Sequence, residues 1–205
     1  MGSTSDQLLD AAARLFAERG IDNVSLAEIV RASEQKNASA LHYHFGSRDE
    51  VLLAILARTV PLIAQRRHEL LLHAADRADV ESALDAIVRP ITEVAGISWR
   101  ERAYLVIGSE LAAGQRTLTP EIEAVLAETE GHEAWALMRE RCPKTPDDLW
   151  AARQEICITM IARAVAERAL VLEEPTHQPV LDDDRFMANL SAMVLGAMTA
   201  PIPKS

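Results

Sequence analysis

Hydrogen-bond donors of several kinds are concentrated between residues 35 and 48 of the chain. Gln35, Lys36 and Asn37 come first, and His42 and Arg48 follow shortly after. Amide, imidazole and cationic side chains can donate to base edges or to phosphate oxygens when a helix carries them into a major groove. The elements around these residues decide whether such a placement is possible.

Two helix starts flank this segment. Ser25 and Ser47 each have a glutamate three positions later, which is the pattern of a capping box. Between them Asn37 can cap a short helix that runs to about Phe45 and needs neighbours to be stable. A short helix packed on another across a tight turn is the geometry of a helix-turn-helix. The spacing therefore predicts a DNA-reading motif.

An amphipathic helix precedes the motif. Its apolar positions recur at helical spacing, and Gly20 suits its C-terminal end. The residues of this apolar stripe are Leu8, Leu9, Ala12, Leu15 and Phe16.

Three separated blocks of this region, residues 9–20, 24–30 and 41–52, resemble the DNA-binding domain of the TetR family of bacterial repressors. The resemblance covers about the first 58 residues. It implies a helix-turn-helix domain over residues 1–47 and a helical effector-binding and dimerisation domain over residues 48–205. It also implies a homodimer that binds double-stranded operator DNA and is released from it by a small molecule.

The chain departs from the common pattern of the family at the turn and on the reading helix. Glu34 stands where a turn glycine is usual, and the base-reading positions hold small residues. Tyr43 points away from the inner face and is expected at a phosphate, whereas His44 is equally compatible with capping, packing or a phosphate contact. The candidate DNA-contacting residues are Ser25, Gln35, Lys36, Asn37, Ala38, Ser39, His42, Tyr43, His44 and Arg48.

Composition favours an all-α fold. The 205 residues are 49% hydrophobic, with few glycines and no alternating Val/Ile/Thr runs. Cys142 and Cys157 form no CxxC pair, and the N-terminus lacks a charged-then-apolar signal, so a cytoplasmic chain is expected. Residues 188–203 are uncharged but too short and too interrupted to span a bilayer, so no membrane partner is expected.

Charge is unusual for a DNA-binding protein. The chain has 21 basic and 31 acidic residues and a net charge of −10. DNA binding must then depend on a local patch and on helix N-termini that donate backbone amides to phosphates. We expect modest non-specific DNA affinity.

The remaining sequence predicts a helical bundle. A long helix begins at Arg48 and contains Pro61, which removes a backbone hydrogen bond and is expected to kink it. Further helix starts are marked at Ser98, at Thr119 and at Thr145, the last two with proline at the first helical position.

Two functional surfaces are expected in this bundle. Tryptophans are usually core residues, but a concentration of them within residues 99–150 can also provide cavity walls. The candidate ligand-pocket residues are Trp99, Tyr104, Trp135, Met138, Trp150 and Met160. Residues 150–172 and 186–198 are expected to supply most of the dimer contact. The candidate interface residues on the last helix are Phe186, Leu190, Met193, Val194 and Met198.

The main alternative to a DNA-binding regulator is an enzyme. His68 and His73 are five positions apart instead of four, so they diverge around a helix and cannot share one zinc ion. Gly108-Ser109 lacks the second glycine of a nucleophile elbow, and no phosphate-cradling glycine loop occurs. We therefore expect no enzyme, metal or cofactor. A DNA-binding dimer without a small-molecule effector remains an alternative.

Overall fold

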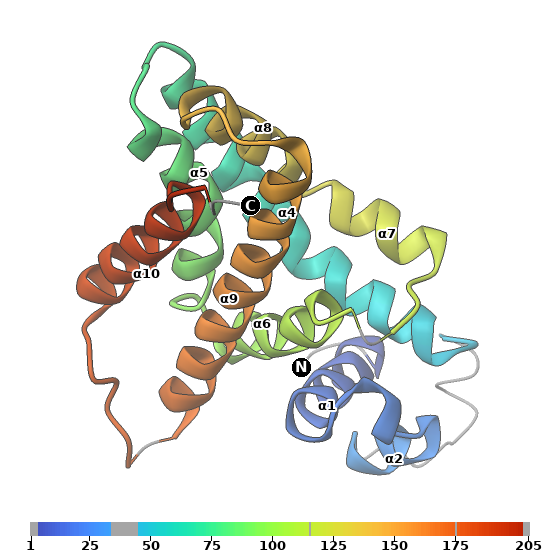
Figure 1. Ribbon diagram of the computed structural model, residues 1–205. Helices are drawn as coiled ribbons and strands as arrows, with labels where there is room; N and C mark the ends of the chain where they lie inside the picture. Colours follow the sequence, from blue (N-terminus) through green and yellow to red (C-terminus); the bar gives the residue numbers. More distant parts are fainter. Residues whose placement is uncertain (1–3, 34–44, 115, 175, 203–205) are drawn as a thin grey trace.

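The computed structural model describes residues 4–33, 45–114, 116–174 and 176–202, and every regular element in these residues is helical (Figure 1). The elements are α1 (Thr4–Arg19), the 3₁₀ helix η1 (Ile21–Asn23), α2 (Leu26–Ala32), α4 (Arg48–Ala75), α5 (Val80–Val94), α6 (Trp99–Ala112), α7 (Pro120–Ala127), α8 (Gly131–Arg141), α9 (Asp147–Glu173) and α10 (Asp183–Met198). The prediction of an all-α fold is confirmed. None of the described helices is long and apolar enough to cross a membrane.

The first helices form as the local sequence predicts. The apolar stripe of α1 is buried, with Leu8 and Phe16 each 1% exposed. Gly20 follows the helix with a φ of 84°, a conformation that favours glycine. At the start of α2, Ser25 accepts from the Glu28 amide at 3.3 Å, and the Glu28 carboxylate accepts from the Ser25 amide at 2.9 Å. These hydrogen bonds to the charged form lower the pKa of Glu28.

The second expected capping box forms only in half. Ser47 accepts from the Glu50 amide at 3.1 Å, but the Glu50 carboxylate accepts from the Gly46 amide at 2.8 Å and not from that of Ser47. The helix still begins at Arg48, as predicted. Thr145 differs more, because its hydroxyl donates to the Pro143 carbonyl and α9 begins after Pro146, at Asp147.

Helix α4 connects the N-terminal helices to the rest of the molecule (Figure 1). Its 28 residues span roughly 42 Å at the rise of an α-helix. Leu52 and Leu56 near its start are fully buried, and the helix packs on α5, α7 and α8. Pro61 lies inside the helix on an exposed position.

Helix α10 lies beside α9 and also contacts α5 (Figure 1). Leu190, Val194 and Met198 are at most 2% exposed, so they belong to the core of this chain. Their prediction as a free apolar seam is corrected, because the stripe packs within the subunit. Met193 faces the other side and is 51% exposed, and Phe186 is partly buried beneath the Arg168 guanidinium, which lies 4.5 Å from its ring centroid.

Candidate functional site

Most of the residues expected at DNA lie outside the described part of the chain. They are Gln35, Lys36, Asn37, Ala38, Ser39, His42, Tyr43 and His44. Of the other two, Ser25 is exposed at the start of α2, where its hydroxyl donates to the Glu28 carboxylate at 2.7 Å.

Arg48 connects the start of α4 to the segment before α2. Its Nε donates to the Val24 carbonyl at 3.1 Å, and its guanidinium lies 3.3 Å from an oxygen of Asp22. Asp22 is 60% exposed, and an exposed pair of this kind is weak. The exposed Asp22 carboxylate therefore holds Arg48 only weakly, and the Val24 carbonyl helps to orient the side chain.

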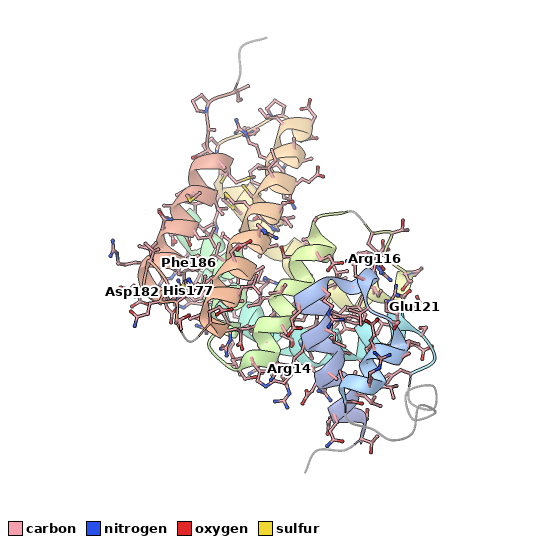
Figure 2. All side chains as sticks on the ribbon, turned by 90° about the horizontal axis from the view of Figure 1, so that it is seen from below. Arg14, Arg116, Glu121, His177, Asp182 and Phe186 are labelled. Carbon is pink, nitrogen blue, oxygen red and sulfur yellow. The ribbon has the colours of Figure 1, made fainter. Side chains whose placement is uncertain are left out.

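A second arginine, from a distant part of the chain, also contacts Asp22. Arg116, in the loop between α6 and α7, pairs with both Asp22 and Asp49. Its side chain is only 16% exposed, and Figure 2 shows it beside the N-terminal helices. The loop is thus attached to η1 and to the first turn of α4.

Helix α6 also forms hydrogen bonds with η1 and with α1. Both carboxylate oxygens of Glu110 lie 3.1 Å from the backbone nitrogen of Ile21, which donates to them. At the other end of the helix, the guanidinium of Arg100 donates to Asp10 on α1 at 2.6 and 2.7 Å. These residues are about 90 positions apart in the chain, and no local spacing pattern revealed them.

A largely apolar cavity of about 360 Å³ lies in the body of the protein, within the size range of small-molecule sites. We call it the body cavity. It is lined by Ile63, Arg67, Ile87, Ile91, Tyr104, Leu105, Gly108, Ser109, Leu111, Ala112, Leu118, Leu126, Thr129, Gly131, Trp135, Ile158, Ile161 and Ala162. Helix α6 contributes the largest share of this wall.

Arg67 is the charged residue in this wall. The residue is 3% exposed, and its guanidinium donates to the backbone carbonyls of Ala86, Ile87 and Thr129. Burial lowers the pKa of Arg67 to about 10, which still leaves it protonated at neutral pH. Burial also raises the pKa of the neighbouring Tyr104 to about 12, so that its hydroxyl is neutral.

Comparison with known protein families finds a match for the N-terminal helices. Residues 8–55 match the family model of the bacterial regulatory proteins of the tetR family. This part of the chain is thus similar to the TetR family of regulators. The recognition of this family from its three sequence blocks is confirmed.

Solved structures show that the TetR-type fold extends over the whole chain. A TetR-family regulator from Bordetella parapertussis 12822 aligns over 100% of both chains with 16% identity and a TM-score of 0.58. AibR in complex with isovaleryl coenzyme A and operator DNA aligns over 98% of this chain and 100% of its own, with 19% identity and a TM-score of 0.57. A regulator from Saccharomonospora viridis in complex with choline covers 93% and 94%, with 19% identity and a TM-score of 0.51. No curated protein matches the sequence.

The body cavity includes two of the six wall residues expected from the sequence, Tyr104 and Trp135. Trp99 lies elsewhere, in an open hollow of about 640 Å³ between α1, α6 and α9, with the Arg14 guanidinium 3.7 Å from its ring centroid. Met138, Trp150 and Met160 are absent from the lining of both. Met138 is fully buried, and Trp150 donates from its ring nitrogen to Gln154 at 3.1 Å.

Proposed function

We propose that the protein is a non-catalytic, cytoplasmic transcriptional repressor that leaves a palindromic operator when a small, mostly apolar ligand fills the body cavity. In this proposal residues 1–47 read DNA, and residues 48–205 bind the ligand and a second copy of the chain. The family of the N-terminal domain supports the DNA-binding half of the proposal.

One observation carries the ligand-responsive half. Helix α6 both lines the body cavity and contacts the DNA-binding domain: Tyr104 and Gly108 line the cavity, whereas Glu110 accepts from Ile21 in η1. A ligand that displaces α6 therefore changes the support of the N-terminal helices directly. Because only differential affinity shifts an equilibrium, the ligand must bind the released conformation better than the DNA-bound one.

DNA contact is assigned to the segment between α2 and α4. Lys36 and Asn37 are proposed at bases, Tyr43 and Arg48 at phosphates, and the N-terminus of α4 beside Arg48 can donate amides to the backbone. Lys36→Ala or Asn37→Ala should then alter the preference between operator variants, whereas a change at Tyr43 should weaken binding to all sequences.

Two relatives of similar fold support control by a ligand. AibR is known with isovaleryl coenzyme A and with operator DNA, and the S. viridis regulator is known with choline. The first ligand is an acyl thioester and the second a quaternary amine, so the fold does not select one chemistry. The ligand of this protein must be inferred from its own cavity.

Operator release can be tested in one series. The promoter region next to the encoding gene is footprinted, and the protected palindrome is labelled for fluorescence anisotropy. Compounds that raise the thermal midpoint of the free protein are then added to the complex. We expect at least one of them to weaken operator binding about tenfold, in line with ordinary coupling free energies. Stabilising compounds that all leave operator affinity unchanged would refute the ligand-controlled part of the proposal.

A further inference from the structure

The body cavity has an uneven chemistry that bears on its ligand. Among the described residues that line it, Arg67 is the one with a charged side chain, and Tyr104, Ser109 and Thr129 supply the other polar side chains. The remaining walls are aliphatic or small, with Trp135 as the further aromatic residue. The cavity therefore presents one cation to a mostly apolar space.

Arg67 has no direct ion-pair partner among the described residues, although the more distant carboxylates of Glu130 and Glu133 act on its charge. Its three hydrogen bonds go to backbone carbonyls, Ala86 at 2.9 Å, Ile87 at 3.4 Å and Thr129, and no described carboxylate forms an ion pair with it. A guanidinium has five N–H donors, so two remain for another acceptor.

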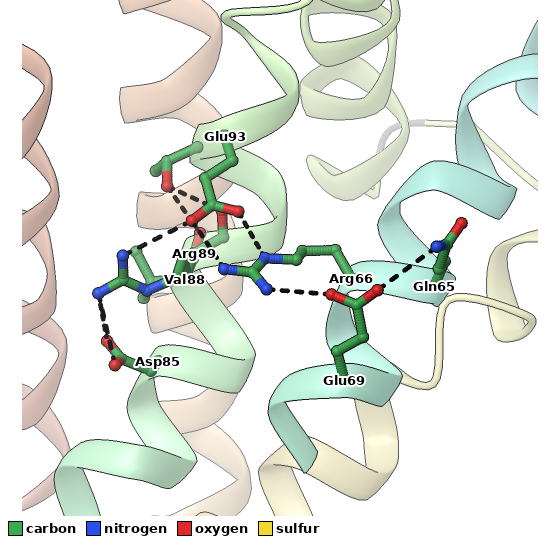
Figure 3. A network of polar contacts seen from close by, with 8 residues as sticks. Gln65, Arg66, Glu69, Asp85, Val88, Arg89 and Glu93 are labelled. Atoms are coloured by element: carbon green, nitrogen blue, oxygen red, sulfur yellow. Dashed lines mark hydrogen bonds and ion pairs between the residues drawn. The ribbon is translucent and has the colours of Figure 1, made fainter. Parts of the chain in front are cut away.

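The neighbouring Arg66, unlike Arg67, is bonded to carboxylates. Arg66 points out of the body, where the Glu93 carboxylate accepts from its Nε at 2.7 Å and Glu69 accepts at 3.0 Å (Figure 3). Its charge is thus neutralised by carboxylates and by solvent. Consecutive arginines on α4 differ in that only the exposed one, Arg66, forms direct ion pairs with carboxylates.

An unpaired buried charge is costly because it loses water without gaining a counter-ion. The three carbonyls orient the guanidinium but carry no net negative charge. A ligand that brings an anion to Arg67 would regain much of that lost free energy, whereas a cation would add to the cost. The planar guanidinium matches a carboxylate, which can accept two parallel hydrogen bonds from it.

We propose that the body cavity binds an amphipathic monocarboxylate, whose carboxylate pairs with Arg67 and whose apolar portion lies against the aliphatic walls. This assignment rests on the proposed function, since it names the ligand class of the same site. One cation calls for one anionic group, and a space of about 360 Å³ suits a compact aliphatic or aryl-alkyl acid.

The ligand side can be tested on the unaltered protein without DNA. Isothermal titration calorimetry would compare the straight-chain carboxylates from hexanoate to dodecanoate, together with phenylbutyrate, each against its matched alcohol and amine. We expect the best carboxylate to bind at least about tenfold more tightly than its alcohol, and the amine not to bind. Equal affinity of acid and alcohol, preference for the amine, or no binding by any carboxylate of the panel would overturn the assignment.

The protein side uses the adjacent arginine as a matched control. Arg67→Met should remove the preference, so that the best acid and its alcohol bind within about twofold of each other, while Arg66→Met should keep it. Arg67→Lys preserves the charge but not the bidentate geometry, so it should retain part of the preference. Circular dichroism verifies folding. Should Arg67→Met fail to fold, Arg67→Lys decides: full retention of the preference would contradict a bidentate pair.

The binding measurements and operator release can fail separately. If a carboxylate binds through Arg67 but the operator complex survives it, the ligand class stands and ligand-controlled release is wrong. If a neutral or cationic compound binds the cavity and releases DNA, the repressor assignment stands and the carboxylate is wrong.

Discussion

At the scale of single residues, Arg48 has both a structural and a proposed DNA-binding role. Its contacts to Val24 and Asp22 fix its side chain at the start of α4. Loss of one phosphate contact lowers the salt slope of binding by about one, so Arg48→Ala should weaken affinity for all sequences and flatten that slope. Fluorescence anisotropy from low to high salt measures both. Arg66→Ala, far along α4, should leave the slope unchanged, and a normal slope in Arg48→Ala would reject the phosphate contact.

Residue type alone was a poor guide to the cavity. Met138 and Trp150 were expected in its wall because tryptophans are concentrated within residues 99–150, but large apolar side chains fill a helical bundle. The cavity lies instead where side chains are small: a Cβ added to Gly108 would meet nothing within 4 Å. Tyr104, Gly108 and Ala112 recur every four residues on α6, and this stripe was a signal available in the sequence. The role of Arg67 could not be predicted from the sequence, because the carbonyls that accept its hydrogen bonds lie 19 to 62 positions away.

At the scale of elements, local signals predicted the helices well. Ser25, Ser47, Ser98 and Thr119 all cap helices as their spacing indicates, because capping depends on residues within one turn. How helices contact one another depends on distant pairs. The sequence drew attention to Pro61 in α4, whereas the structure adds Glu110, an α6 residue bonded to η1.

Two routes from the cavity to the DNA-binding domain can therefore be compared. Glu110→Ala removes the acceptors of the Ile21 amide and should lower the ratio of operator affinities without and with ligand by about fivefold or more, while each site still binds. Pro61→Ala, at an exposed position, tests α4 in the same assay. Anisotropy titrations with and without a stabilising ligand give the ratio. If Glu110→Ala keeps the wild-type ratio, α6 is not part of the transmission path. If Pro61→Ala keeps it, the proline has no role in the coupling.

At the scale of the whole molecule, a net charge of −10 opposes binding to the DNA phosphates, and one helix-turn-helix contacts too few base pairs for useful specificity. A two-fold dimer resolves this, because two motifs about 34 Å apart contact successive major grooves on one DNA face and keep the acidic bodies away from it. We propose that the outer faces of α9 and α10 form the dimer contact. Ile156 and Met193 are 65% and 51% exposed on these faces, so their apolar side chains are available for such a contact.

The burial of side chains on α10 predicts different effects for two substitutions on this helix. Met193→Glu should give folded monomers with at least about a hundredfold weaker operator binding, because a charge at the contact opposes association while the core stays intact. Leu190→Glu, at a position 2% exposed, should unfold the body instead. Light scattering reports the mass and circular dichroism the folding. Val180→Glu, on a side chain 98% exposed between α9 and α10, is the control and should remain dimeric. A folded dimer in Met193→Glu would place the interface on another face of the molecule.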